Sequence, residues 1–461
     1  MWVIVAAVAL RAAAAAAAPL IDDEAYYWLW AQRLAWGYLD HPPMIAWLIA
    51  LTTAVGDGPF LIRLGPLVLG VLTSYAIFLF GRELFGPRAA VGAAVLFQVV
   101  PVLTGAGLLA TPDAPLLLCW AVALRFAWQA LHGRPARWLG AGGVVGLGLL
   151  SKLSMVLLPV GLALYVVIRA ARSLRHWQLY AAAVVAAAVF SPVVVWNAQH
   201  HWAGVTYVLS SRLSTESSAV VGLTGVGKLL EEQMPFALAL LPAYVWALFV
   251  PLRRREEPLT FLALTSLPAL LFPFIPAYAG AWPHGNWLAP AYLGFSVVLG
   301  AAWNRPVAIM AGVNGAAILM SMLVAFIPAL PLLPGAEDVY GWPEAGARVA
   351  AELRDLDDGA AIVADSYQVA AQLGYHARGA AVTVLPCPAP ASIWARPRDV
   401  AGRPGATVID ARREPAVRWA SYARRVEEAP PLVIEVRGRT LRTFRVYRLH
   451  GLTADPRCPT E

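Results

Sequence analysis

Long apolar stretches are the feature that most constrains this chain. In residues 1–334, apolar runs of about 15–20 residues follow one another, separated only by short polar joints. An α-helix needs about 20 such residues to cross the hydrocarbon core of a bilayer. We therefore predict eleven membrane spans, at 2–20, 61–81, 89–109, 114–131, 138–150, 153–168, 177–196, 234–252, 259–277, 288–302 and 307–330. The expected fold class is an α-helical polytopic membrane protein.

Charged residues are divided unevenly along the chain. Residues 1–334 hold 30 of the 63 charged side chains and are about 9% charged, whereas residues 335–461 hold 33 and are about 26% charged. Soluble domains average about 25%. We therefore predict a transmembrane domain at 1–334 and a small C-terminal α/β extracytoplasmic domain at 335–461. The boundary falls at the Pro/Gly-rich run that ends at Gly335.

The polar joints form two alternating sets. One set is basic and contains Arg82, Arg88, Arg134, Arg137, Arg169, Arg172, Arg175, Arg253, Arg254, Arg255 and Arg305. The other holds most acids of this part, namely Asp22, Asp23, Glu24, Asp40, Asp57, Asp113, Glu216, Glu231 and Glu232. Because Lys and Arg concentrate in cytoplasmic loops, we predict an N-terminus inside and a C-terminal domain outside. The net charge of +7 is then mostly a topology signal, and no nucleic-acid partner is expected.

The N-terminus and the cysteines leave alternatives open. Residues 1–20 also have the character of a signal peptide with a cleavage site in the alanine run. An uncleaved first span is preferred, because no basic segment precedes it and an acidic loop follows it. Cys119 lies in a predicted span and is interpreted as an apolar filler. Cys387 and Cys458 lie in the outward domain, where a disulfide between them is one alternative.

The first predicted outer loop, residues 21–60, is the most informative stretch. Three consecutive acids begin it, and seven aromatic residues lie between Tyr26 and Trp47. An interfacial aromatic belt and a charged helix N-terminus are the structural interpretations. The functional interpretation is sugar chemistry at the membrane surface, since a carboxylate can accept the proton of an attacking hydroxyl. Residues 43–54 are too short to span and predict an interfacial helix that begins at Pro42-Pro43.

Several motifs taken together resemble one enzyme family. They are Asp23-Glu24 followed by Ala-Tyr-Tyr-Trp, Asp40-His-Pro-Pro43, Thr111-Pro-Asp113, Ser191-Pro-Val-Val-Val-Trp-Asn-Ala-Gln-His200 and Gly285-Asn-Trp-Leu-Ala-Pro-Ala-Tyr292. Over residues 1–300 the chain resembles the polytopic C-type-fold glycosyltransferases that use lipid-phosphate sugar donors. These include glycosyltransferase family 39, the protein mannosyltransferases and the bacterial aminoarabinose lipid A transferases. The outward domain is similar to theirs only in being a small α/β domain that follows the last span.

The resemblance implies a catalytic base at Asp23, with Glu24 beside it. The base would deprotonate an acceptor hydroxyl, which attacks the anomeric carbon. The lipid phosphate would leave, and the configuration of the sugar would invert. Asp22 competes for this role, because three adjacent acids raise one another's pKa. Among the aromatic residues of the loop, Tyr27 is interpreted as substrate-binding.

Further polar residues are implied on the same side of the membrane. Asp40 corresponds to an acid that binds metal or substrate in some relatives, and His41 offers a proton-dependent positive charge. Asp113 corresponds to an acid close to the active site. Helix capping is the alternative for both acids. Asp40 with His284 is the candidate pair of metal ligands, so a divalent metal ion is the one cofactor that the sequence raises.

Lys152 is interpreted as a ligand of the lipid phosphate. A lysine between two short spans is costly unless it is used, and relatives carry a lysine after a similar span. Arg63 and Arg212 are candidate helpers, because a leaving phosphate is stabilised by cationic groups. Snorkelling of these long side chains to the membrane surface is the alternative for all three.

The outward domain alternates helix-like and strand-like stretches. Helices are predicted at 342–356 and 367–375, and strands at 360–364, 381–385, 406–410, 432–436 and 443–447. The last two strands are expected to form a hairpin around Arg437-Gly-Arg439. No catalytic constellation stands out, so we interpret the domain as an acceptor-side or stabilising cap.

The leading hypothesis is a bacterial cytoplasmic-membrane enzyme that acts on the outer face. It would transfer a sugar, with inversion, from a polyprenyl-phosphate-linked donor to a lipid, glycan or protein acceptor. The alternative is a transporter or flippase of lipid-linked sugars. Such proteins tend to contain inverted repeats, and the sequence shows no repeat. A glycan-binding relative without catalysis is a third hypothesis.

Overall fold

The structure is a computed structural model. It describes residues 2–212, 221–281, 283–324, 339–356, 359–385, 393–413 and 418–453. The chain divides into two compact units. The first comprises Met1–Ala16, Trp36–Leu48 and Arg63–Met322, and the second comprises Ala17–Ala35, Ile49–Ile62 and Leu323–Glu461. The acidic part of the first loop therefore folds with the C-terminal residues, whereas the Asp40-His41 part folds with the bundle.

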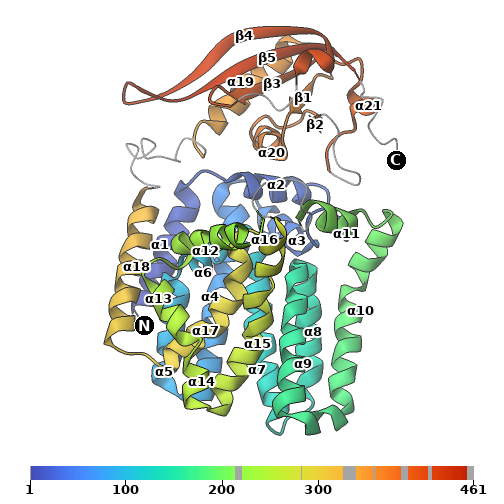
Figure 1. The fold of residues 1–461 in the computed structure, drawn as a ribbon. Helices are drawn as coiled ribbons and strands as arrows, with labels where there is room; N and C mark the ends of the chain where they lie inside the picture. Colours follow the sequence, from blue (N-terminus) through green and yellow to red (C-terminus); the bar gives the residue numbers. More distant parts are fainter. Residues whose placement is uncertain are drawn as a thin grey trace. The chain divides into compact units, whose positions relative to one another are not determined.

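The first unit is a helical bundle (Figure 1). The helices that lie wholly or mostly in it are α1 (Trp2–Ala17), α4 (Pro59–Phe85), α5 (Pro87–Val99), α6 (Pro101–Ala106), α7 (Asp113–Leu131), α8 (Arg137–Ser151), η1 (Leu153–Val156), α9 (Leu157–Arg169), η2 (Ala171–Arg175), α10 (Trp177–Gln199), α11 (Ala203–Tyr207), η3 (Val208–Arg212), α12 (Leu223–Ala237), η4 (Leu238–Leu240), α13 (Leu241–Ala247), α14 (Val250–Arg254), α15 (Glu257–Leu271), α16 (Phe274–Ala279), η5 (Gly285–Leu288), α17 (Ala289–Ala301) and α18 (Arg305–Val324). Helix α3 (Met44–Thr53) is divided between the two units after Leu48. Each of the eleven predicted spans contains helix, and the helix predicted at 43–54 is α3. Its interfacial position stays a prediction.

Six helices in the described part of the chain are long and apolar enough to cross a membrane. They are Pro59–Phe85, Asp113–Leu131, Trp177–Gln199, Leu223–Arg254, Glu257–Ala279 and Arg305–Met322. A seventh is counted if Ile4–Ala17 and Asp22–Ala31 are taken together. Helices α5, α8, α9 and α17 have only 13 to 15 residues each. The predicted polytopic helical fold is confirmed, but the count of eleven includes helices shorter than a full span.

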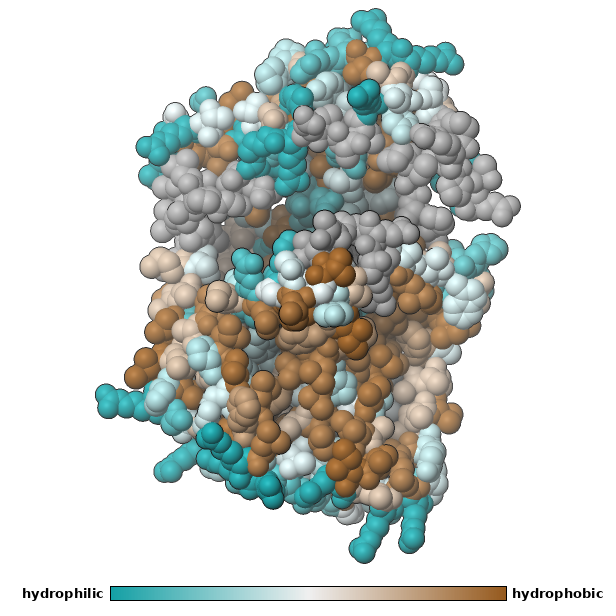
Figure 2. Space-filling model, in the orientation of Figure 1, coloured by the Kyte–Doolittle hydropathy of each residue, from teal (hydrophilic) through white to brown (hydrophobic). Residues whose placement is uncertain are grey.

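The face of the bundle that Figure 2 shows is apolar over its middle. Figure 2 shows hydrophobic residues gathered over the middle of the bundle and hydrophilic residues at the end where α9 and α14 finish. The arginines of the predicted basic joints are exposed, as at Arg82, Arg172 and Arg253. A broad apolar band of this kind is the surface that a protein presents to lipid tails.

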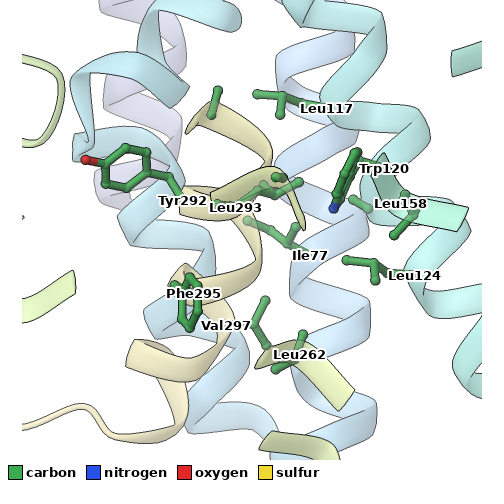
Figure 3. Close-up of a cluster of buried hydrophobic side chains, with 14 of the residues drawn as sticks. Ile77, Leu117, Trp120, Leu124, Leu158, Leu262, Tyr292, Leu293, Phe295 and Val297 are labelled. Atoms are coloured by element: carbon green, nitrogen blue, oxygen red, sulfur yellow. The ribbon is translucent and has the colours of Figure 1, made fainter. Parts of the chain in front are cut away.

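Large apolar side chains fill the interior of the bundle. Figure 3 shows Ile77, Trp120 and Leu158 in this cluster, together with Leu262 and Leu293. These five residues come from five helices, α4, α7, α9, α15 and α17, and each is at most 1% exposed. This packing fixes the ends of α7 and α17, next to which the polar residues described below lie.

Helices α8 and α10 approach each other closely through glycines. A Cβ added at Gly142 would lie 2.7 Å from Ala182 Cα, and one added at Gly146 would lie 2.6 Å from Val189 Cβ. Small residues spaced four apart allow membrane helices to pack with their backbones in contact. The glycines of α8 thus explain why its backbone can lie so close to that of α10.

Replacing Gly142 by alanine should lower the melting temperature of the protein in detergent. The backbone of α10 would have to move, and overpacking of this kind costs about 1–3 kcal/mol. Gly143→Ala is the matched control, because its Cβ would meet Val185 Cγ1 at an ordinary 3.9 Å. Thermal unfolding followed by tryptophan fluorescence measures both variants. Equal melting temperatures would contradict the close contact.

The second unit combines α2 (Asp22–Ala31) with a small mixed sheet. Its other elements are α19 (Trp342–Asp355), β1 (Ala361–Ala364), α20 (Tyr367–His376), β2 (Val382–Val384), α21 (Pro397–Val400), β3 (Gly405–Asp410), η8 (Trp419–Ser421), β4 (Ala423–Val436) and β5 (Arg439–Leu452). The strand order is β2-β1-β3-β5-β4. Strand β1 pairs in parallel with β2 and β3, whereas β5 is antiparallel to β3 and β4.

The predicted elements of the outward domain are all found. Every predicted strand overlaps an observed one, although β1 and β2 are slightly shorter than predicted and β4 and β5 are much longer. The hairpin turns at Arg437 and Gly438, both with positive φ. Buried Arg442 donates to Asp410 Oδ2 at 2.9 Å and lies 4.4 Å from the ring centre of Trp342. Burial raises the pKa of Asp410, but hydrogen bonds from its arginine neighbours outweigh this and lower it to about 2. The predicted boundary run, Cys387 and Cys458 lie outside the described residues.

Candidate active site

The three acids of the first loop form the first turn of α2. A helix N-terminus stabilises negative charge, which explains why three adjacent acids are tolerated there. Glu24 is fully buried, and its Oε2 accepts the N–H of Ile21 at 3.2 Å. This hydrogen bond caps the helix. A catalytic role for Glu24 stays a prediction beside that structural one.

Asp22 and Asp23 are each bound by a side chain from α20. Asp22 Oδ1 accepts a hydrogen bond from Gln372 Nε2 at 2.9 Å, and Asp23 Oδ1 accepts one from the Tyr367 hydroxyl at 3.3 Å. Burial raises the pKa of Asp22, against the hydrogen bond from Gln372, which lowers it. The two carboxylates therefore differ in surroundings, although the sequence presents them as neighbours. Tyr367 and Gln372 were not predicted as site residues.

Aromatic residues of α2 pack inside the second unit. Tyr27 is 5% exposed, and its ring meets Trp30 edge-on with centroids 5.0 Å apart. Tyr26 stacks on Trp394 at 5.7 Å. These rings hold the helix in place and present little surface to a substrate. The substrate-binding role of Tyr27 stays a prediction.

The first unit contains a buried ion pair between the ends of neighbouring helices. Lys152 follows α8, and its Nζ lies 2.8 Å from Oδ1 of Asp113, the first residue of α7. The residues are 9% and 6% exposed. Asn286 of η5 donates to the other oxygen, Oδ2, also at 2.8 Å. Asp113 therefore does not cap its own helix. Its carboxylate instead joins three separate elements.

Two further contacts stabilise this network. Ser151 donates to the carbonyl of Pro112 at 2.5 Å, which ties the end of α8 to the start of α7. Glu232 of α12 accepts the N–H of Gly285 at 2.7 Å and so anchors η5 next to Asn286. In the sequence, Glu232 was noted only as one of the acids in the polar joints between spans, and Asn286 only as part of a motif. Their polar character in an apolar stretch was the available signal.

The remaining predicted residues are placed as follows. Asp40 and His41 are half-buried just before α3, and His284 is exposed just before η5. No group of three or more His, Cys, Asp or Glu that could hold a metal ion occurs among the residues that the structure describes. The metal pair of Asp40 and His284 therefore stays a prediction.

Arg63 has a hydrogen-bond partner in the bundle, whereas for Arg212 the structure gives only its position at the end of η3. Arg63 is 1% exposed, and its guanidinium donates to the carbonyl of Ala15 at the end of α1 at 3.0 Å. This contact satisfies an end-of-helix carbonyl, which is a structural use of the charge. Arg212 ends η3. Phosphate binding by either residue stays a prediction.

Comparison with known proteins shows which class of enzyme the chain resembles. Residues 40–196, which include Asp40, Asp113 and Lys152, match the family model described as dolichyl-phosphate-mannose-protein mannosyltransferase. The lipid A galacturonosyltransferase RgtD of Rhizobium johnstonii is 27% identical over 415 residues, which are 83% of this chain and 84% of the relative. The chain is a polytopic glycosyltransferase of the C-type fold. The resemblance predicted from its motifs is confirmed.

Solved structures agree with this glycosyltransferase fold. ArnT from Cupriavidus metallidurans, in the apo state, aligns with a TM-score of 0.70 at 14% identity and covers 97% of both chains. The same protein bound to undecaprenyl phosphate aligns with a TM-score of 0.69 at 15% identity. The undecaprenyl phosphate-alpha-4-amino-4-deoxy-L-arabinose arabinosyl transferase 2 of Pseudomonas fluorescens is 31% identical over 135 residues, 28% of this glycosyltransferase and 23% of the relative.

Proposed function

We propose that this glycosyltransferase moves a sugar from a polyprenyl-phosphate-linked donor to a membrane lipid. The observation that carries the proposal is the relationship to RgtD, named for lipid A and galacturonic acid, over most of both chains. An undecaprenyl-phosphate-linked aminoarabinose donor appears in the name of the second relative. A lipid acceptor is favoured over a protein or glycan acceptor, because RgtD is named for lipid A.

The proposed chemistry divides between two groups of residues. Asp23 acts as general base on the acceptor hydroxyl, whose oxygen attacks the anomeric carbon of the donor. The bond from that carbon to the phosphate oxygen breaks, the lipid phosphate leaves with the bonding electrons, and the configuration inverts. Lys152 stabilises the negative charge of the leaving phosphate, because a fixed cation in a low-dielectric site lowers the energy of such a charge.

Asp113 and Asn286 position the lysine in this mechanism. A lysine side chain has four flexible bonds. A lysine that binds the leaving phosphate lowers the activation barrier of transfer only if its Nζ is held in place. The carboxylate of Asp113 holds Nζ at 2.8 Å, and the Asn286 amide holds that carboxylate from the other side. A lysine Nζ has three donors, so one bond to Asp113 leaves capacity for a phosphate oxygen.

The proposed location is the outer face of a bacterial cytoplasmic membrane. The exposed arginines of the basic joints support an orientation in which these joints face the cytoplasm. The joints with Asp113 and Lys152 then face outward, as does the first loop with Asp23. The N-terminus is inside and the C-terminal domain outside.

A transfer assay with separate acceptors tests the proposed function. Membranes that contain the protein are incubated with polyprenyl-phosphate donors carrying radiolabelled galacturonic acid, aminoarabinose or mannose. Lipid A, membrane protein and polysaccharide are then separated. We expect label in the lipid fraction with at least one donor, and none in membranes that lack the protein. Label confined to protein or polysaccharide would contradict the lipid acceptor.

A further inference from the structure

Helix α20 packs against α2, the helix that contains the proposed base (Figure 1). Both helices belong to the second unit. Tyr367 begins α20, and its hydroxyl donates to Asp23 Oδ1 at 3.3 Å, across 344 residues of sequence. Gln372 donates to Asp22 Oδ1 at 2.9 Å and to the carbonyl of Leu20 at 3.1 Å. One helix of the C-terminal domain thus binds two of the three acids.

Packing of aromatic rings holds Tyr367 next to Asp23. Its ring lies 5.2 Å from the ring of Tyr26, which in turn stacks on Trp394 at 5.7 Å and an interplanar angle of 18°. Tyr26 and Trp394 are 4% and 8% exposed. Stacked rings in a close-packed interior have little freedom to rotate. The hydroxyl of Tyr367 is therefore presented to Asp23 from a fixed direction.

The rest of the contact between α2 and the C-terminal residues does not depend on that hydroxyl. Trp28 meets the ring of Tyr375 edge-on at 4.9 Å, and its indole nitrogen donates to Asp57 Oδ1 at 3.1 Å. Arg378 forms an ion pair with the same Asp57 at 2.9 Å. Loss of the single Tyr367 hydroxyl should therefore leave α2 and α20 packed together.

Gln372 distinguishes Asp22 from Asp23. Its side chain is fully buried, and its amide nitrogen serves both Asp22 and the backbone just before α2. Asp22 is thereby tied to the backbone of its own helix start, which is a structural use of the carboxylate. Asp23, in contrast, is oriented by the hydroxyl of Tyr367.

We propose that Tyr367 is a positioning residue for sugar transfer, holding the carboxylate of Asp23 in the orientation needed to receive the acceptor proton. This inference rests on the proposed function. Placement comes before basicity in general-base catalysis, and a misplaced group loses much of its effect. A length of 3.3 Å exceeds the usual 2.7–2.8 Å of an O–H···O bond. Hydrogen bonds in catalytic sites commonly shorten in the reacting complex. The C-terminal domain thus takes part in the transfer step itself.

Replacing Tyr367 by phenylalanine tests this role in the full-length protein. We expect kcat to fall roughly tenfold, while KM for the polyprenyl-phosphate donor stays within about twofold of wild type. Tyr375→Phe is the matched control, because it removes a hydroxyl from the same helix and keeps the ring on Trp28. That variant should keep wild-type kcat. Thermal unfolding in detergent should be alike for the wild type and both variants.

The outcomes distinguish the positioning role of Tyr367 from the proposed function of the whole protein. A Tyr367→Phe protein with wild-type kcat would overturn the positioning role and leave the proposed function intact. An equal loss of kcat in Tyr367→Phe and Tyr375→Phe, together with a lower melting temperature, would also overturn it, because the helix would then matter only for stability. A wild-type protein that cleaves no donor would instead contradict the proposed function.

Discussion

Replacing Asp23 by asparagine should reduce sugar transfer by roughly 10²- to 10⁴-fold, the range that a general base contributes. Asparagine keeps the size of the side chain and can still accept a hydrogen bond from Tyr367 at its amide oxygen. It cannot take the proton of an acceptor hydroxyl. Donor binding and folding should therefore be retained, and the loss should fall on kcat. Steady-state transfer of labelled sugar by the purified protein in detergent measures this.

Asp22→Asn is the control for this prediction. Asp22 occupies the same first turn of α2, but its carboxylate is bound by Gln372. An amide oxygen at that position can still accept the Gln372 hydrogen bond, so we expect less than a tenfold change in kcat. A larger loss in Asp22→Asn than in Asp23→Asn would assign the base to Asp22 and contradict our interpretation of the first loop.

Replacing Lys152 by methionine should have the second large effect. The change removes the cation proposed to stabilise the leaving phosphate, and we expect a loss in kcat of roughly 10²- to 10³-fold, as for other electrostatic stabilisers of a transition state. It also leaves Asp113 buried without its ion-pair partner, which costs roughly 3–5 kcal/mol of stability. Both transfer and the melting temperature should therefore fall in the single variant.

The double variant Asp113→Asn, Lys152→Met separates catalysis from stability. Two neutral side chains of similar size remove the uncompensated charge, and an asparagine at 113 can still accept from Asn286. The melting temperature should therefore recover toward the wild-type value. Transfer should remain low, because no cation has been restored. A double variant with wild-type transfer would show that the pair is structural only.

The sequence predicted the membrane bundle because hydrophobic length is a local property. Each predicted span contains a helix, and each helix or strand predicted in the outward domain overlaps an observed element of the same kind. The runs predicted at 138–150, 153–168 and 288–302 were already short, as α8, α9 and α17 are. The sequence did not show that α5 ends at Val99, because apolar residues beyond a helix lengthen a hydropathy run. It also could not assign the first loop, whose acidic part folds with residues from the C-terminal domain.

Residues of the candidate site could be predicted where a single charged residue lies in an apolar stretch of sequence. Lys152 and Asp113 each drew notice as charges at the end of a span, and the structure brings them together at 2.8 Å. Asn286 was hidden because it carries no charge. Tyr367 and Gln372 were hidden because nothing in one sequence links a tyrosine in an outward domain to an acid 344 residues earlier. Their roles depend on tertiary packing alone.

Cleavage of the donor is the central claim, and it separates an enzyme from a transporter of lipid-linked sugar. The measurement is the release of free polyprenyl phosphate by the purified protein in liposomes that contain labelled donor and lipid A. We predict one polyprenyl phosphate released for each sugar that appears on lipid A, and release lost in Asp23→Asn. Movement of intact donor across the bilayer, with no polyprenyl phosphate released, would contradict the account.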